Sequence, residues 1–151
     1  LASCSQPQNP NFETNVEIAK AWFADFETED MDKVASYFAD ELEYQGAFYG
    51  MPMMNTKDQV VQYMQGWHSA MDNIKYAAEN YLPGVDPETN LPNGSVRTYG
   101  TWTGVSTTSG KSFEAKFYHY LTFDENGLIV KGGDYGDAMG IMVAVAPDPA
   151  E

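Results

Sequence analysis

Two aspartates, Asp134 and Asp137, stand in a glycine-rich segment near the end of the chain, VKGGDYGDAMG, residues 130–140. Four of these eleven residues are glycine, and a glycine inside a strand often marks the close approach of another group. A carboxylate in an apolar pocket can bind a ligand or exchange a proton with it. The chemistry therefore depends on which aspartate points into the protein.

Side chains on a strand point alternately to its two faces, and this alternation separates the two aspartates. Gly132, Asp134 and Gly136 share one face, and Lys131 lies on the other. Because lysine prefers solvent, Asp134 is predicted to point inward, with the flanking glycines leaving room around its carboxylate. Asp137 is predicted to end the strand or to begin a turn.

The preceding strand, residues 111–124, carries the second candidate, His119. This histidine shares a nearly apolar face with Phe117 and Leu121, so it is predicted to face the core. A buried imidazole needs a hydrogen-bond partner, and burial favours its neutral form, which can act as a general base. An ordinary core histidine is the alternative. The two strands form one hairpin, so we expect His119 and Asp134 to be within hydrogen-bond reach. Asp134 then either handles a proton or only orients His119.

The elements that position this pair are predicted from periodicity and turn signals. Residues 14–30 carry one apolar helical stripe, with Thr14 and Glu17 at the spacing of a capping box. A short helix follows Asp30, and a third helix is predicted over residues 57–72, with Thr56 and Gln59 as its capping box. Strands are predicted over residues 41–48, 73–85, 95–107, 111–124 and 128–137. This order predicts an α+β fold, with about three N-terminal helices packed on one face of an antiparallel sheet.

Composition excludes several classes of function. The chain has 151 residues, the size of one domain. Its formal charge of −14 repels phosphate backbones, so no nucleic-acid partner is expected. No apolar run reaches the roughly 20 residues of a membrane span. Two histidines and one cysteine form no transition-metal set, and we expect neither a metal nor a cofactor.

Three segments together resemble the SnoaL-like group of the NTF2-like superfamily. They are AKAWFADFETEDMDKVASYFADELEY (residues 19–44), YGTWTG (99–104) and FYHYLTFDENGLIVKGGDYGDAMGIM (117–142). The resemblance covers residues 14–142 and implies a cone, in which a strongly curved antiparallel sheet wraps around a pocket that the helices close. The family includes polyketide cyclases, ketosteroid isomerase, epoxide hydrolases, dehydratases and members that only bind or scaffold. In its cyclases an inward aspartate near the last strand acts as acid/base, and Asp134 resembles it in placement.

The pocket implied by the resemblance has walls drawn from the apolar faces of the predicted helices and strands. Residues at such spacing are equally typical of a plain core, and His68 is expected to flank the pocket rather than to catalyse. The predicted wall residues are Trp22, Phe26, Tyr44, Trp67, His68, Met71, Trp102, Phe117 and Leu121.

The opposite face of the sheet carries four tyrosines, Tyr99, Tyr118, Tyr120 and Tyr135. Aromatic side chains on a face that should meet water suggest a covered surface. Dimers through the convex sheet face are common in the family. A homodimer through this face is therefore expected.

The single cysteine, Cys4, stands in the sequence LASC at the start of the chain. This context resembles a bacterial lipobox, in which the cysteine is lipidated; a chance cysteine is the alternative. Residues 1–13 are then a lipobox remnant and a flexible tether, residues 14–142 the domain, and residues 143–151 a C-terminal tail. We expect a lipid-anchored protein of the bacterial cell envelope, on the periplasmic side of the outer membrane, touching the membrane only through its anchor.

Three functions follow from these observations. The first is a tethered domain that binds a small, mostly apolar molecule in its central cavity. The second is an isomerase, cyclase or dehydratase that uses Asp134 as general acid/base with His119. No arginine and no second carboxylate can be assigned to the pocket, which argues against this second function. The third is a structural dimerisation domain without activity.

Overall fold

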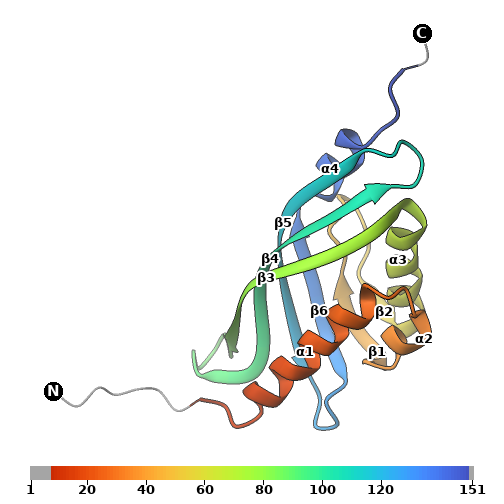
Figure 1. Ribbon diagram of the computed structural model, residues 1–151. Helices are drawn as coiled ribbons and strands as arrows, with labels where there is room; N and C mark the ends of the chain where they lie inside the picture. The colour runs from red at the N-terminus through yellow and green to blue at the C-terminus, as the bar shows by residue number, and fades with distance from the viewer. Residues whose placement is uncertain (1–7, 150–151) are drawn as a thin grey trace, which may run out of the picture.

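A computed structural model describes residues 8–149 of the protein. A six-stranded curved sheet, in the order β2-β1-β6-β5-β4-β3, carries helices on one side (Figure 1). This architecture confirms the predicted α+β cone. The helices are α1 (Phe12–Phe26), α2 (Met31–Ala35), α3 (Lys57–Ala70) and α4 (Ala138–Ala144), and the strands are β1 (Phe38–Gln45), β2 (Met54–Thr56), β3 (Met71–Val85), β4 (Pro92–Ser106), β5 (Ser112–Phe123) and β6 (Ile129–Gly136).

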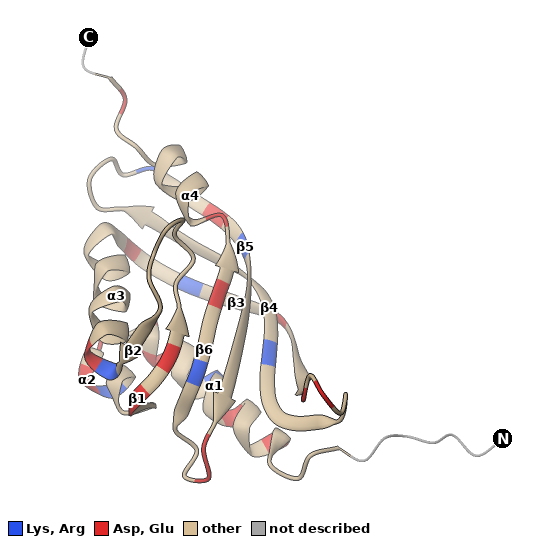
Figure 2. Ribbon diagram, turned by 180° about the vertical axis from the view of Figure 1, so that it is seen from behind, with Lys and Arg blue, Asp and Glu red and all other residues tan. Residues whose placement is uncertain are grey.

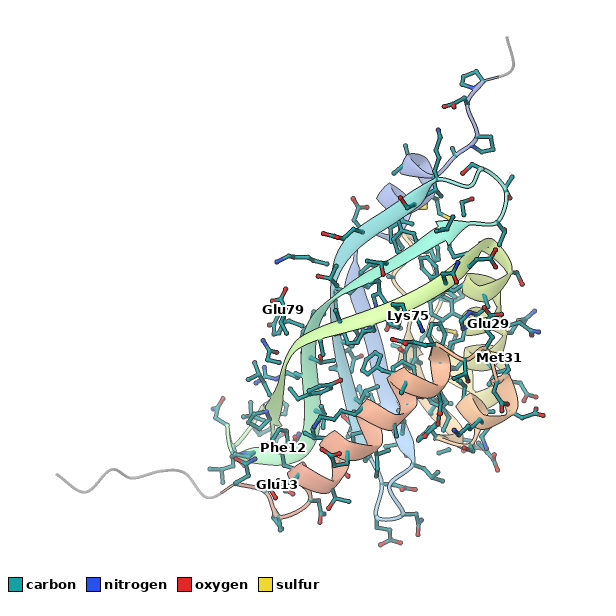
Figure 3. The ribbon with its side chains drawn as sticks, viewed as in Figure 1. Phe12, Glu13, Glu29, Met31, Lys75 and Glu79 are labelled. Atoms are coloured by element: carbon teal, nitrogen blue, oxygen red, sulfur yellow. The ribbon has the colours of Figure 1, made fainter. Side chains whose placement is uncertain are left out.

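Helix α1 begins before the predicted capping box. Its N-cap is Asn11, which makes no side-chain cap, and Thr14 lies inside the first turn. The prediction was wrong because tertiary contacts extend the helix: Phe12 is buried, and the Asn15 side chain donates to the Gly94 carbonyl oxygen at 2.8 Å. Figure 3 shows Phe12 at the start of α1, near the connection from β3 to β4. From there the buried stripe of α1 crosses the concave face of the sheet.

Helices α2 and α3 begin where the sequence predicts. The Asp30 side chain accepts from the Lys33 amide, and Thr56 and Gln59 form a complete capping box. Helix α3 ends at Ala70, two residues earlier than predicted, because Met71 is already extended and starts β3. The chain thus turns from helix to strand without a loop, and Thr107 donates to the freed Ala70 carbonyl oxygen.

The sheet differs from the prediction in one pair of strands. Strands β1 and β6 run parallel, whereas every other pair is antiparallel. After β1 the chain crosses through β2 and α3 to the far edge and returns strand by strand, so that β6 reaches β1 in the same direction. The long β3–β4 ladder has three shifts of register, and such irregularities bend a sheet.

The C-terminal segment is more ordered than the predicted tail. Helix α4 crosses the expected boundary at residue 142, with Asp137 as its N-cap, and Val145 is buried. The Ser109 hydroxyl donates to the Val145 carbonyl oxygen at 2.5 Å. Cys4 lies outside the described residues. Within residues 8–149 no helix is long and apolar enough to span a bilayer.

Candidate functional site

A cavity of about 50 Å³ lies between the concave face of the sheet and helices α1, α3 and α4. Its surface is mostly apolar, and one carboxylate faces it. Among the described residues, no cluster of three or more histidine, cysteine, aspartate or glutamate side chains offers a metal site. The lining residues are Trp22, Phe26, Tyr44, Tyr63, Met64, Trp67, Ile74, Trp102, Phe113, Phe117, His119, Asp134 and Ile141.

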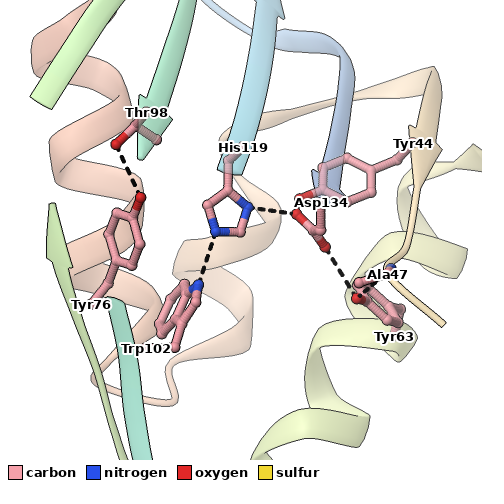
Figure 4. Close-up of polar contacts among 8 residues, drawn as sticks. All are labelled: Tyr44, Ala47, Tyr63, Tyr76, Thr98, Trp102, His119 and Asp134. Atoms are coloured by element: carbon pink, nitrogen blue, oxygen red, sulfur yellow. Dashed lines mark hydrogen bonds and ion pairs between the residues drawn. The ribbon is translucent and has the colours of Figure 1, made fainter. Parts of the chain in front are cut away.

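The carboxylate belongs to Asp134, whose side chain is 9% exposed. Its Oδ1 accepts from the Tyr44 hydroxyl at 2.6 Å and lies 2.8 Å from His119 Nδ1, and its Oδ2 accepts from the Tyr63 hydroxyl at 3.1 Å (Figure 4). The donors come from three elements, β1, β5 and α3. A carboxylate has about four acceptor sites, so three donors leave Oδ2 able to accept one more hydrogen bond.

A tryptophan decides the tautomer of His119. The Trp102 indole Nε1–H donates to His119 Nε2 at 2.8 Å, and an indole nitrogen can only donate. His119 Nε2 therefore carries no proton, and the proton of the neutral ring is on Nδ1, where it is donated to Asp134. In this arrangement His119 has no free basic nitrogen. Trp102 and Asp134 thus hold the two ring nitrogens of His119, and the His119–Asp134 contact is compatible with either predicted role of Asp134.

The two tyrosines stay protonated donors. Burial first, and then the neighbouring Asp134 charge, raise the pKa of Tyr44 well above its ordinary value. The same two effects raise the pKa of Tyr63. The Tyr63 hydroxyl oxygen also accepts from the Ala47 amide at 3.3 Å, which aims its own proton at Asp134. The carboxylate is thus held by neutral groups.

The glycines beside Asp134 do not leave open space, contrary to prediction. A Cβ on Gly132 would lie 2.6 Å from the Tyr44 ring, and one on Gly136 would lie 2.5 Å from the Phe117 ring. Aromatic rings from the two neighbouring strands β1 and β5 occupy these places. The glycines let both rings lie against the backbone of β6, and one of those rings carries the hydroxyl that binds Asp134.

The sequence model of the SnoaL-like domain family matches residues 19–132. The chain belongs to this family. Among curated proteins, none matches the sequence closely enough to count as a relative.

Solved structures share the NTF2-like fold of this SnoaL-like domain at low identity. A candidate SnoaL-like polyketide cyclase from Jannaschia sp. CCS1 is 15% identical, with a TM-score of 0.76 over 96% of this chain and 100% of that one. A candidate isomerase from Bacillus subtilis is 16% identical (TM-score 0.75, 90% and 95% covered). A protein with a ketosteroid isomerase-like fold from Catenulispora acidiphila DSM 44928, in complex with trimethylamine, is 14% identical (TM-score 0.71, 87% and 94% covered).

The structure brings most of the predicted site residues of the SnoaL-like domain together. Asp134 and His119 are direct partners on β6 and β5, and both line the cavity. Met71 and Leu121 are fully buried but do not line the cavity. Leu121 Cδ2 lies 3.3 Å from the position that a Cβ on Gly132 would occupy. His68 is not a lining residue either. The predicted wall residues that do line the cavity are Trp22, Phe26, Tyr44, Trp67, Trp102 and Phe117.

Sequence reasoning missed Tyr63, the third donor to Asp134. Tyr63 lies within the predicted third helix, four residues before the predicted wall residue Trp67. A tyrosine at the edge of an apolar stripe is a weak signal, because its hydroxyl usually reaches water. Met64, Ile74, Phe113 and Ile141 were also missed as lining residues.

His68 lies beside the cavity wall and is short of partners. Its side chain is 7% exposed, its ring packs 4.3 Å from the Phe26 ring, and neither ring nitrogen has a hydrogen bond. Glu29 Oε1 is 3.8 Å from Nδ1. Burial lowers the pKa of His68, and the Glu29 charge opposes that effect without cancelling it. His68 is therefore uncharged in the folded protein, and its ring packs against Phe26, which lines the cavity.

His68 should make stability depend on pH. Since its folded pKa is depressed, the unfolded chain takes up the proton first, near pH about 6.5. Stability is therefore complete above that value and falls as pH drops toward the folded pKa. When the pH is lowered from about 7.5 to about 5.5, the free energy of unfolding measured in urea should fall less in His68→Phe than in the unchanged protein. Equal losses in the two proteins would contradict this assignment.

Proposed function

We propose that the cavity binds a small, mostly apolar molecule that donates a hydrogen bond to Asp134. The observation that carries this proposal is the unfilled acceptor capacity of Oδ2: one donor, Tyr63, reaches it at 3.1 Å, while two donors hold Oδ1. A buried carboxylate oxygen with a vacant acceptor site favours a ligand that donates there.

The size and lining of the cavity limit the ligand. Drug-sized sites span roughly 300–1,000 Å³, and this cavity has about 50 Å³, room for a group of a few heavy atoms. Three tryptophans, Trp22, Trp67 and Trp102, line it and offer apolar contact area. One protein of the same fold holds trimethylamine, a molecule of comparable size, which supports a small ligand here as well.

A second candidate function is acid–base catalysis of the isomerase or cyclase kind. It is favoured by a carboxylate that three donors hold rigidly at the cavity wall, as a general base requires. Carbonyl chemistry also needs a donor for the developing oxyanion. Tyr44, Tyr63, His119 and Trp102 already donate within the site. Among the described lining residues, the Trp22 indole is the buried donor without a partner, so it is the group that would serve the oxyanion.

Asp134→Asn separates the two functions. The protein is titrated with a panel of small alcohols, ketones and amines, and tryptophan fluorescence reports binding. The affinity should be about 10- to 100-fold weaker in the variant, because a hydrogen bond to a charged group contributes about 1.5–3 kcal/mol. Lost turnover with retained binding would instead identify an enzyme. Asp137→Asn is the matched control, since Asp137 only caps α4 and asparagine caps equally well. A panel without any Asp134-dependent binding or turnover would refute both functions.

The tyrosine face of the sheet supports a separate proposal, a homodimer. The Tyr99 and Tyr118 rings lie 4.9 Å apart and the Tyr118 and Tyr135 rings 5.7 Å apart, while Tyr99 and Tyr135 are 45% and 58% exposed. We propose that a second copy covers this row of rings. Sedimentation should give a dimer at micromolar concentration that dissociates in Tyr135→Glu. The third candidate function is purely structural: the domain would serve only to form this dimer.

We also propose that Cys4 carries the lipid anchor of an envelope protein. The support is the LASC sequence and the polar stretch behind it. Labelled palmitate should be incorporated by the full-length protein in bacterial cells and not by Cys4→Ser. Equal labelling of the two proteins would show that the lipid is not attached to Cys4 and would contradict the proposal.

A further inference from the structure

Among the described residues, 8–149, no lysine or arginine pairs with the Asp134 carboxylate. Among the residues that the structure describes, no lysine or arginine lines the cavity. Arg97, the single arginine, donates to the Pro83 carbonyl oxygen. The seven lysines all pair with other carboxylates: Lys20 with Glu17, Lys33 with Asp25, Lys57 with Asp40, Lys75 with Glu27, Lys111 with Asp148, Lys116 with Glu79 and Lys131 with Glu43.

The groups that do bind Asp134 add no positive charge. His119 is neutral because its Nε2 accepts from Trp102, and Tyr44 and Tyr63 donate as uncharged hydroxyls. Dipoles hold the carboxylate, but the site keeps one net negative charge. A buried charge without a counter-charge is costly, so a ligand that brings a positive charge gains more at this site than a neutral one.

The rest of the lining also favours a cation. Eight of the thirteen lining residues are tryptophan, tyrosine or phenylalanine, and the faces of such rings attract cations, most strongly when water is excluded. A metal ion would need several oxygen or nitrogen ligands, whereas this cavity supplies a single carboxylate. Rings around one carboxylate instead suit an ammonium group with apolar substituents.

The charge of the whole protein acts in the same direction. At −14, the field of the molecule concentrates small cations around it and repels anions. Figure 2 shows acidic residues spread over the helices and strands, with the basic residues scattered among them. In this view (Figure 2) the basic residues do not gather on one element, as a site for an anionic ligand would require.

We propose that the ligand is a small alkylammonium ion, whose N–H donates to Asp134 Oδ2 and whose alkyl groups contact the aromatic rings. This inference rests on the proposed binding function and names its ligand class. The positive charge supplies the counter-charge that the described residues do not give Asp134, and the alkyl groups match the apolar walls.

The test compares two molecules of the same shape, tert-butylammonium and tert-butanol, which differ in charge. Chemical-shift titration of the indole N–H signals, at about 0.15 M salt to screen surface charges, should show the ammonium binding at least about tenfold more tightly. Asp134→Asn should abolish this preference, and Asp137→Asn should keep it. If Asp134→Asn proves unstable, the comparison of the two molecules in the unchanged protein still tests the inference, because equal affinities there would contradict it.

Two outcomes overturn the inference in distinguishable ways. If tert-butanol or other neutral members of the panel bind in an Asp134-dependent manner and the ammonium binds no better, the ligand class is wrong and the binding function stands. If no molecule of the panel binds at all, both the ligand class and the binding function fail.

Discussion

Gly132→Ala should destabilise the protein by about 1–3 kcal/mol, although it adds a single methyl group. The new Cβ would lie 2.6 Å from Tyr44 Cε2 and 3.3 Å from Leu121 Cδ2. Tyr44 is 1% exposed, and its hydroxyl is held by Asp134, so its ring cannot move aside without losing that hydrogen bond. Urea unfolding measures the loss, and the ligand titration should show weaker binding as well.

The neighbouring glycine provides a matched control for this prediction. A Cβ on Gly133 would lie equally close, 2.6 Å, to a tyrosine ring, that of Tyr120. This ring lies on the outer face of the sheet and is only half-buried, so it can turn toward solvent. Gly133→Ala should therefore lose much less stability and leave the site intact. Equal losses of stability in Gly132→Ala and Gly133→Ala would show that the Tyr44 ring on the inner face is held no more firmly than the Tyr120 ring on the outer face.

His119→Leu should destabilise the protein by about 1–3 kcal/mol, because the buried Trp102 indole N–H is left without an acceptor. Asp134 also loses one of its three donors. The size of the leucine side chain keeps the packing change small, so the loss reports mainly on the hydrogen bonds. Urea unfolding of the single variant measures it.

A double-mutant cycle shows whether His119 and Trp102 act as one unit. Trp102→Phe removes the N–H that His119→Leu would leave unpaired. The double variant should therefore be more stable than the sum of the two single losses predicts, by about 0.5–3 kcal/mol of coupling. Additive losses would mean that the hydrogen bond at 2.8 Å contributes nothing, and that Trp102 does not orient His119.

Local patterns were sufficient to predict most elements of the fold. The capping box of Thr56 and Gln59 and the cap of Asp30 begin α3 and α2 as predicted, because such signals depend on a few neighbouring residues. The start of α1 was wrong because Phe12 and Asn15 are held by distant parts of the chain. The parallel pairing of β1 with β6 joins segments about 90 residues apart, which no local pattern encodes.

The sequence by itself determined that Asp134 and His119 share the inner face, because alternation and a short hairpin fix both side and register. Only the tertiary structure decided their relation, since the partners come from elsewhere: Trp102 from β4, Tyr44 from β1 and Tyr63 from α3. It also decided the cavity, because the space that two glycines leave is filled by rings from the adjacent strands. Side-chain direction is local, whereas hydrogen-bond partners and free volume depend on how distant segments pack.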